Sequence, residues 1–113
     1  MPKSYVPDEG DIVWLQFDPQ AGRREQAGHR PALVLSPLAY NAKTNLMLCC
    51  PLTTQVKSYP FEVAFTDGGS QSAVLADQLK FLDWKVRKAK FKSKLPRQTM
   101  VTVKLKIKAL LGL

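Results

Sequence analysis

Apolar and polar residues alternate along several short segments of the chain, and this period of two indicates β-strands. The first such segment covers residues 11–17 and is bounded by turn signals at Gly10 and at Asp18-Pro19. The same pattern, or a short apolar run, predicts further strands at 31–36, 46–52, 61–65, 73–75 and 78–82. Short strands separated by Pro, Gly and Asn turns are typical of a small barrel or sandwich, and we favour a mainly β barrel.

A polar loop connects the first two predicted strands. Residues 18–29 include two glycines and the charged run Arg23-Arg24-Glu25, with few apolar residues. The loop is longer than a plain hairpin requires, and long surface loops often carry function.

The C-terminal segment fits two patterns. Apolar and polar residues alternate over 101–108, as in a strand with a basic face. A helix is also consistent, because apolar residues form one helical stripe, Pro96 stands where a first turn tolerates proline, and Gly112 is suited to end the helix. Periodicity alone leaves both interpretations open. Before this segment, the Lys-rich run 85–94 is the only part that resembles a linker.

Length and composition describe one small globular domain. A chain of 113 residues, 45% of them apolar, has room for a single core, so we predict one domain over residues 1–113. No apolar run is long enough to cross a membrane, and the first residues do not resemble a signal peptide. We therefore expect a cytoplasmic protein that does not associate with membranes.

The cysteines and the histidine argue against a metal site. Cys49 and Cys50 are neighbours in an apolar run, so a strand points them to opposite faces, and we predict reduced core residues. One histidine and two adjacent cysteines match none of the usual zinc-binding spacings. We predict no metal and no other cofactor.

The net charge of +8 is distributed unevenly. Residues 1–79 contain six basic and eight acidic residues, a net charge of −2. Residues 80–113 contain eleven basic residues and only Asp83 as an acid, a net charge of +10. Such a dense, one-sided charge favours a polyanion partner such as nucleic acid, with a solvated basic face as the simpler alternative.

The segment EQAGHRP, residues 25–31, is the best candidate for chemistry. It places a carboxylate, the only imidazole and a guanidinium at the junction of the polar loop and the second strand. Metal-free cleavage of RNA needs a base for the ribose 2′-OH, a cation for the charge that develops on the phosphate, and a donor for the leaving 5′-oxygen. Glu25, Arg30 and His29 match these roles, and a structural Glu25–Arg30 pair beside a surface histidine explains the spacing equally well.

Seven blocks in a fixed order give a more specific signal than any single motif. They are PDxGDIVW at 7–14, FDP at 17–19, EQAGHRPALVLSP at 25–37, YNxKT at 40–44, PxTTQ at 51–55, YPFEV at 59–63 and ADQ at 76–78. Together they resemble the MazF/PemK family of toxin–antitoxin ribonucleases over nearly the whole chain.

The resemblance implies an SH3-like small barrel of the MazF/CcdB/Kid type, mainly β with a C-terminal helix. It also implies a homodimer whose subunits share a groove for single-stranded RNA. Members of this family inhibit growth by cutting mRNA at short sequences without a metal, leaving 2′,3′-cyclic phosphate and 5′-hydroxyl ends. An acidic antitoxin of the MazE type, whose flexible tail occupies the groove, silences them, and the basic charge suits both partners.

The resemblance also assigns site residues. The family's essential arginine corresponds to Arg30 and its phosphate-binding hydroxyl to Thr53. From the residues alone, the segment around Thr53 is equally consistent with the end of a strand. Glu25 matches the loop carboxylate and is the predicted general base, and His29 is a further catalytic candidate. Because the pKa of arginine exceeds about 12, Arg30 is assigned to stabilising the pentavalent phosphate, and the proton donor to the leaving oxygen stays open. The predicted RNA-binding residues are Asp18, Gln26, Asn41, Lys57, Gln78, Lys80 and Arg87.

Two features extend or depart from this pattern. Trp14, Phe17 and Tyr40 are candidates for stacking on bases, with core packing as the alternative. The loop segment 22–25 reads Gly-Arg-Arg-Glu, with more positive charge than the single small residue expected there. We therefore expect the RNA affinity or the cleavage sequence to differ from those of relatives.

Two other functions are consistent with the same fold. A CcdB-like toxin shares the barrel but acts by binding gyrase, and a non-catalytic RNA-binding barrel needs only the basic charge. The EQAGHRP cluster together with Thr53 favours cleavage, because a gyrase binder has no use for a site that cleaves phosphodiesters.

Overall fold

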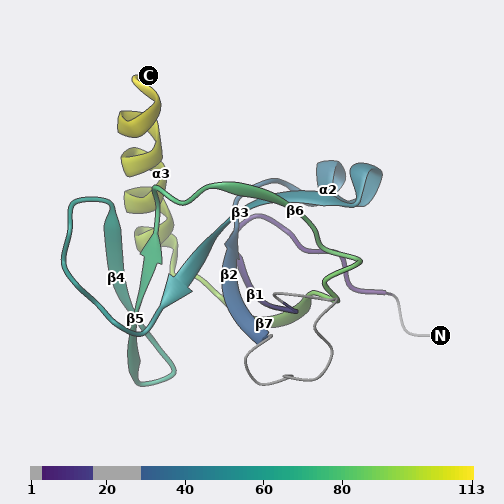
Figure 1. Cartoon of the computed structure of the whole chain (residues 1–113), viewed down its shortest axis with the longest axis horizontal. Helices are drawn as coiled ribbons and strands as arrows, with labels where there is room; N and C mark the ends of the chain where they lie inside the picture. Colours follow the sequence, from purple (N-terminus) through teal and green to yellow (C-terminus); the bar gives the residue numbers. More distant parts are fainter. Residues whose placement is uncertain (1–3, 17–28) are drawn as a thin grey trace.

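The computed structural model describes residues 4–16 and 29–113 of the chain (Figure 1). The strands are β1 (Asp11–Gln16), β2 (His29–Val34), β3 (Leu46–Thr53), β4 (Glu62–Asp67), β5 (Ser70–Leu75), β6 (Lys80–Asp83) and β7 (Lys90–Lys94), and the helices are α2 (Leu38–Thr44) and α3 (Arg97–Leu111). Each of the predicted strands is confirmed, with ends that differ from the prediction by no more than three residues.

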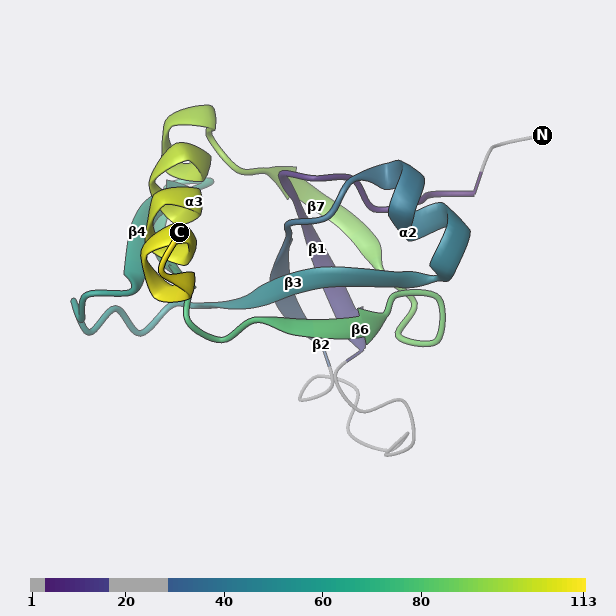
Figure 2. The ribbon, with the colours of Figure 1, turned by 90° about the horizontal axis from the view of Figure 1, so that it is seen from above.

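The strands pair antiparallel into one curved sheet in the order β4-β5-β3-β2-β1-β7, with β6 beside β3. β3 is central, because one of its edges pairs with β2 while the other pairs with β6 along residues 46–49 and with β5 at residues 52–53. The sheet therefore bends around β3 into a half-open barrel, as the view from above shows (Figure 2). The predicted mainly β small barrel is confirmed in this half-open form.

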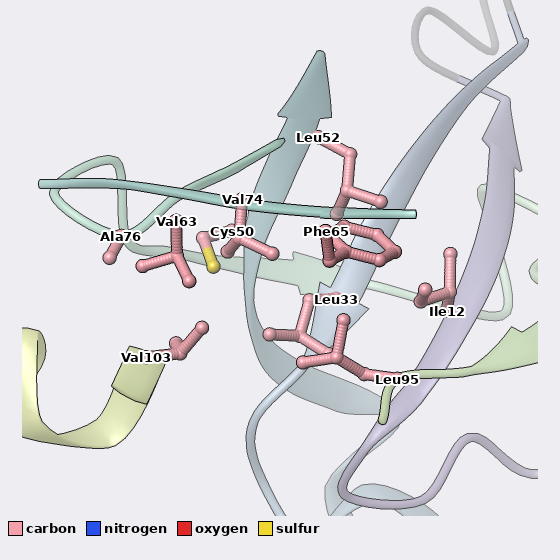
Figure 3. Close-up of a cluster of buried hydrophobic side chains, with 10 residues drawn as sticks. All are labelled: Ile12, Leu33, Cys50, Leu52, Val63, Phe65, Val74, Ala76, Leu95 and Val103. Atoms are coloured by element: carbon pink, nitrogen blue, oxygen red, sulfur yellow. The ribbon is translucent and has the colours of Figure 1, made fainter. Parts of the chain in front are cut away.

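Two hydrophobic clusters lie on opposite faces of the sheet. The first consists of Ile12, Leu33, Cys50, Leu52, Val63, Phe65, Val74, Ala76, Leu95 and Val103 (Figure 3). The second consists of Val13, Leu15, Ala32, Val34, Met47, Cys49 and Trp84. Cys49 and Cys50 are both unoxidised and buried, one in each cluster, which confirms their prediction as reduced core residues on opposite faces.

The C-terminal segment is the helix α3, which runs beside β4 (Figure 1). Val103 is fully buried in the first cluster, and Met100 and Ile107 pack against it. The helix ends at Gly112, whose φ of +73° is a left-handed conformation that glycine adopts without strain. Neither helix in the described part of the chain is long and apolar enough to cross a membrane.

The prediction that residues 85–94 form a linker is wrong. Residues 90–94 form β7, which pairs with β1 and places Lys94 opposite Asp11 and Lys90 opposite Trp14. β7 is an edge strand, where lysine side chains are common because their charge opposes pairing with another chain. α2 is a second element that the sequence pattern did not predict.

Candidate functional site

Arg30 and Thr53 lie near the ends of the paired strands β2 and β3. The two strands pair antiparallel, with Ala32 opposite Pro51 and Leu33 opposite Cys50. This pairing ends at Ala32 and Pro51, and Arg30 and Thr53 each lie two residues beyond that last pair, on the strand faces that carry Ala32 and Pro51. The sequence separates these two residues by 23 positions, and the pairing of β2 with β3 brings their strand ends into the same region of the sheet.

A pocket of about 130 Å³ opens on this face. Its floor is mostly apolar, and three cationic side chains and one amide stand at its rim. The lining residues are Leu15, Arg30, Pro31, Ala32, Cys49, Pro51, Gln78, Lys80, Leu82 and Arg87. The pocket thus joins Arg30 to three of the predicted RNA-binding residues.

Different elements position the other two cations of this pocket. Lys80 begins β6 opposite Cys49 of β3, so both side chains belong to the face that carries the pocket. Arg87 lies in the turn between β6 and β7, where its carbonyl oxygen accepts the Gln16 N–H at 2.8 Å and its Nη1 donates to the Gln16 carbonyl at 3.4 Å. The guanidinium of Arg87 is therefore held beside the last residue of β1.

A second pocket of about 160 Å³ adjoins the first. It is lined by Thr53, Gln55, Lys57, Tyr59, Glu62, Leu75 and Gln78. Gln78 lines both pockets, so they are neighbours, with Arg30 and Arg87 in the first and Lys57 in the second. We call the two pockets together the groove.

The Thr53 hydroxyl is oriented by the backbone. Its Oγ1 accepts the Gln55 N–H at 3.0 Å, a local turn that ends the strand. A hydroxyl that accepts in this way still has its own proton to donate. Thr53 can therefore donate a hydrogen bond to an anionic oxygen in the second pocket.

Cys49 gives the first pocket a neutral floor. The residue is 1% exposed, and burial raises its pKa to about 11, although the nearby Lys80 and Arg87 lower it. The thiol is therefore protonated at neutral pH. An apolar floor beneath a cationic rim suits a nucleotide, whose base is flat and largely apolar and whose phosphate is anionic.

His29 precedes Arg30 in β2, and its side chain lies on the opposite face of the strand. It is the exposed first residue of β2, opposite Gln16 of β1. Successive residues of a strand point to opposite faces, and His29 is not among the described residues that line either pocket.

The prediction that Asn41 binds RNA is wrong for this fold. The Asn41 side chain is fully buried. Its Oδ1 accepts the Ser36 hydroxyl at 2.6 Å, and its Nδ2 donates to the carbonyls of Pro7 at 2.8 Å and Ser36 at 3.0 Å. Asn41 therefore fastens α2 to the N-terminal segment, and its polar atoms are already used.

Several predicted residues are not placed by the structure. Glu25, Gln26, Asp18 and Phe17 lie outside the described residues, as does the arginine-rich segment 22–25. Predictions for these residues stay predictions.

The two aromatic candidates that the structure describes do not line the groove. Trp14 is 37% exposed and alternates along β1 with Leu15, which lines the first pocket. Its ring lies 5.4 Å from the Lys92 ammonium. The Tyr40 ring instead packs edge to face on the Phe81 ring, with their centroids 6.3 Å apart.

Glu62 and Tyr59 line the second pocket and were not predicted. The sequence pattern placed Glu62 only within the strand predicted at 61–65. The block YPFEV contains both residues and was the available signal. Among the described residues, no three His, Cys, Asp or Glu side chains gather closely enough to hold a metal ion.

Comparisons with known proteins find matches in both sequence and fold. The sequence matches the family described as PemK-like, MazF-like toxins of type II toxin–antitoxin systems over residues 8–111. The endoribonuclease toxin MazF of Escherichia coli K12 is 48% identical over 112 residues, which cover 99% of this chain and 100% of that protein. A crystal structure of MazF from Deinococcus radiodurans has a TM-score of 0.84 at 50% identity, covering 97% of this chain and 100% of that one. A MazE–MazF complex from the same organism contains a chain with a TM-score of 0.85 at 44% identity, covering 97% and 99%.

Proposed function

Because the chain belongs to the PemK-like, MazF-like toxins of type II toxin–antitoxin systems and is an endoribonuclease, we propose that it cuts single-stranded mRNA at short sequences without a metal ion. The observation that carries the proposal is the groove. Arg30 lines its first pocket and Thr53 its second, and Lys80 and Arg87 add positive charge at the first pocket. This arrangement suits a phosphodiester better than a protein surface.

The proposed reaction is an internal transfer at phosphorus. The ribose 2′-oxygen attacks the adjacent phosphorus, and the bond between phosphorus and the 5′-oxygen breaks. The 2′-OH proton passes to a base, and the leaving 5′-oxygen takes up a proton. The products are a 2′,3′-cyclic phosphate and a 5′-hydroxyl, with Glu25 as the proposed base.

Arg30 and Thr53 are the proposed phosphate ligands. The guanidinium of Arg30 offers several N–H donors to the negative charge that develops on the pentavalent phosphate. The Thr53 hydroxyl, whose oxygen accepts from Gln55, donates to another phosphate oxygen. Removing one such donor typically costs a factor of about 10² to 10³ in rate.

The cations of the groove supply the charge that a divalent ion provides in many nucleases. Arg30, Lys80 and Arg87 line one pocket of about 130 Å³. Three positively charged side chains that line the same pocket support the proposal of cleavage without a metal ion.

The proposed partners follow from the same groove. A homodimer and an acidic antitoxin of the MazE type are supported by the MazE–MazF complex whose chain is similar to this one. The antitoxin's carboxylates would compete with RNA phosphates for the same cations. We also propose that residues 1–113 act as one toxin domain in the cytoplasm, where mRNA is present.

The test is incubation of the purified protein with a long single-stranded RNA in excess EDTA, with mapping of the cut ends. We expect cuts at one short recurring sequence, with cyclic-phosphate ends. Arg30→Ala and Thr53→Val should each lower the cleavage rate by about 10²-fold or more, whereas the adjacent exposed Thr54→Val should not.

The outcomes separate the candidate functions. Intact RNA after incubation with the folded protein would contradict the proposal and favour gyrase binding or RNA binding without cleavage. Cleavage that EDTA abolishes would contradict the metal-free mechanism alone. Equal losses in the Thr53 and Thr54 variants would contradict the role of Thr53.

A further inference from the structure

The loop between β3 and β4 is held by one carboxylate. The side chain of Glu62 accepts the Lys57 N–H on both oxygens, at 2.9 and 3.0 Å. One of these oxygens also accepts the next backbone N–H, from Ser58. Ser58 has a φ of +61°, a left-handed conformation, and such turns make consecutive N–H groups converge on an anion.

A second contact closes the same loop. The Tyr59 hydroxyl donates to Asp77 Oδ1 at 2.8 Å, and the Glu62 N–H donates to the Tyr59 carbonyl at 3.0 Å. Asp77 is followed directly by Gln78, which lines both pockets. The loop is thereby fixed against the segment that joins the two halves of the groove.

The position of this loop matters for the groove. Thr53 stands at its start and Lys57 in its middle, and both line the second pocket with Glu62. A carboxylate beside an RNA site repels phosphate, so a solvent-facing glutamate here would weaken binding. Glu62 instead directs both oxygens to backbone N–H groups, which disperses part of its charge within the loop.

We infer that Glu62 is a positioning residue for RNA cleavage, which holds the Lys57–Ser58 backbone so that the Lys57 ammonium and the Thr53 hydroxyl meet the same substrate phosphates. The inference rests on the proposed ribonuclease function and adds a residue to it. Glu62 lines the second pocket, but both its oxygens already accept backbone N–H groups of the loop. It acts through Lys57 and the loop.

The test compares two variants that remove one negative charge. Glu62→Gln keeps a side chain of the same size but loses the charge and one accepting oxygen. Glu9→Gln is the matched control, because Glu9 pairs with Lys104, a residue that lines neither pocket of the groove. Each variant loses one negative charge, but only Glu62→Gln loses it inside the groove, so charge alone should make that variant bind RNA at least as well as Glu9→Gln. Slower cleavage by Glu62→Gln therefore reports position rather than charge.

The substrate is a labelled single-stranded RNA oligonucleotide that contains the site cut by the unchanged protein. We expect Glu62→Gln to lower kcat by roughly 10- to 100-fold relative to Glu9→Gln, with a small change in KM. The thermal midpoints of the two variants should stay close, and hydrogen exchange at the Lys57 and Ser58 amides should accelerate only in Glu62→Gln. A variant that is merely less stable would not show this pattern.

A double-mutant cycle with Lys57→Ala identifies the route of the effect. If Glu62 acts through Lys57, then Glu62→Gln should cost much less in the Lys57→Ala background. Equal cleavage by Glu62→Gln and Glu9→Gln, or fully additive losses in the cycle, would overturn the inference. Failure of the unchanged protein to cut RNA would instead overturn the proposed function, and this would be seen before any variant is compared.

Discussion

Cys49 and Cys50 are adjacent in β3, but their environments differ. Burial raises the pKa of both thiols, to about 11 for Cys49 and beyond the ordinary range for Cys50. Cys49 is the less shifted, because Lys80 and Arg87 favour its thiolate. A strand that separates two neighbours onto opposite faces thus places one thiol beside the cations of the groove and the other in the core beneath α3.

The raised pKa values of the two cysteine thiols predict that both are alkylated slowly in the folded protein. The thiolate is the reactive form, and at pH 8 a thiol with a pKa near 11 has about 10²-fold less thiolate than an ordinary cysteine. We expect iodoacetamide to modify the native protein at least about 100-fold more slowly than the protein in urea, as measured by mass spectrometry. Because the folded pKa lies above the unfolded one, the contribution of the Cys49 thiol to the free energy of unfolding should be constant below about pH 8.5 and fall as the pH rises toward 11.

Modification of Cys49 in the native protein at the denatured rate would contradict this prediction. It would mean that the thiolate forms readily beside Lys80. The control is the urea-denatured sample at the same pH, which fixes the rate of an unshifted thiol.

Asn41 shows where reasoning from single residues fails. A polar residue in a block shared with a nuclease family was predicted to bind RNA, yet its amide is used entirely inside the fold. The amide is satisfied by Pro7, 34 positions away, and by Ser36. No local pattern reveals such a distant partner, so a buried structural amide and an exposed binding amide look alike in sequence.

At the scale of elements, the strands of the sheet were predictable because alternation is a local property. β1 alternates between the two clusters residue by residue, with Ile12 in one and Val13 in the other. β7 was missed because its exposed lysines resemble a linker, and only its pairing with β1 makes it a strand. α2 spans seven residues, too few for a helical period to be distinguished from a loop.

The C-terminal helix was chosen by family resemblance, and packing explains why the chain adopts it. Only the helical form puts Met100, Val103 and Ile107 on one side, against the first cluster. The alternating pattern would have placed Val101 and Leu105 with Val103, whereas both are about half exposed or more. Tertiary contacts therefore decide between two patterns that the local sequence fits equally.

This packing predicts unequal effects of two identical substitutions. Val103→Ala removes methyl groups that are fully buried, so we expect the free energy of unfolding to fall by about 1–3 kcal/mol. Val101→Ala removes the same atoms from a side chain that is 49% exposed, and its effect should stay within about 0.5 kcal/mol. Urea denaturation followed by circular dichroism measures both. Equal losses would show that α3 does not pack through Val103.

At the scale of the whole molecule, some basic residues of the C-terminal part form ion pairs within the fold, and others line the groove. Lys92, Lys94 and Lys104 form ion pairs with acidic residues of the N-terminal part, namely Asp67, Asp11 and Glu9. Lys80 and Arg87 line the first pocket. The sequence count of +10 therefore overstates the charge available to RNA, because pairing across the fold cannot be read from a linear sum.

The groove is accordingly the part of the surface where charge should govern RNA affinity. Four cationic side chains line it in the described structure: Arg30, Lys57, Lys80 and Arg87. Each cation that neutralises a phosphate of a single strand releases counterions and contributes about −0.7 to the slope of log K against log salt. Four contacts per chain predict a slope of about −3 for each strand bound.

Binding of a non-cleavable, fully 2′-deoxy oligonucleotide at several salt concentrations measures this slope. Arg87→Ala should reduce its magnitude by about 0.7, since one phosphate contact is lost. Lys92→Ala should leave the slope unchanged, because that ammonium is committed to Asp67 and lines neither pocket of the groove. If both variants reduced the slope equally, oligonucleotide binding would depend on the total charge of the molecule. That result would contradict the groove as the binding site.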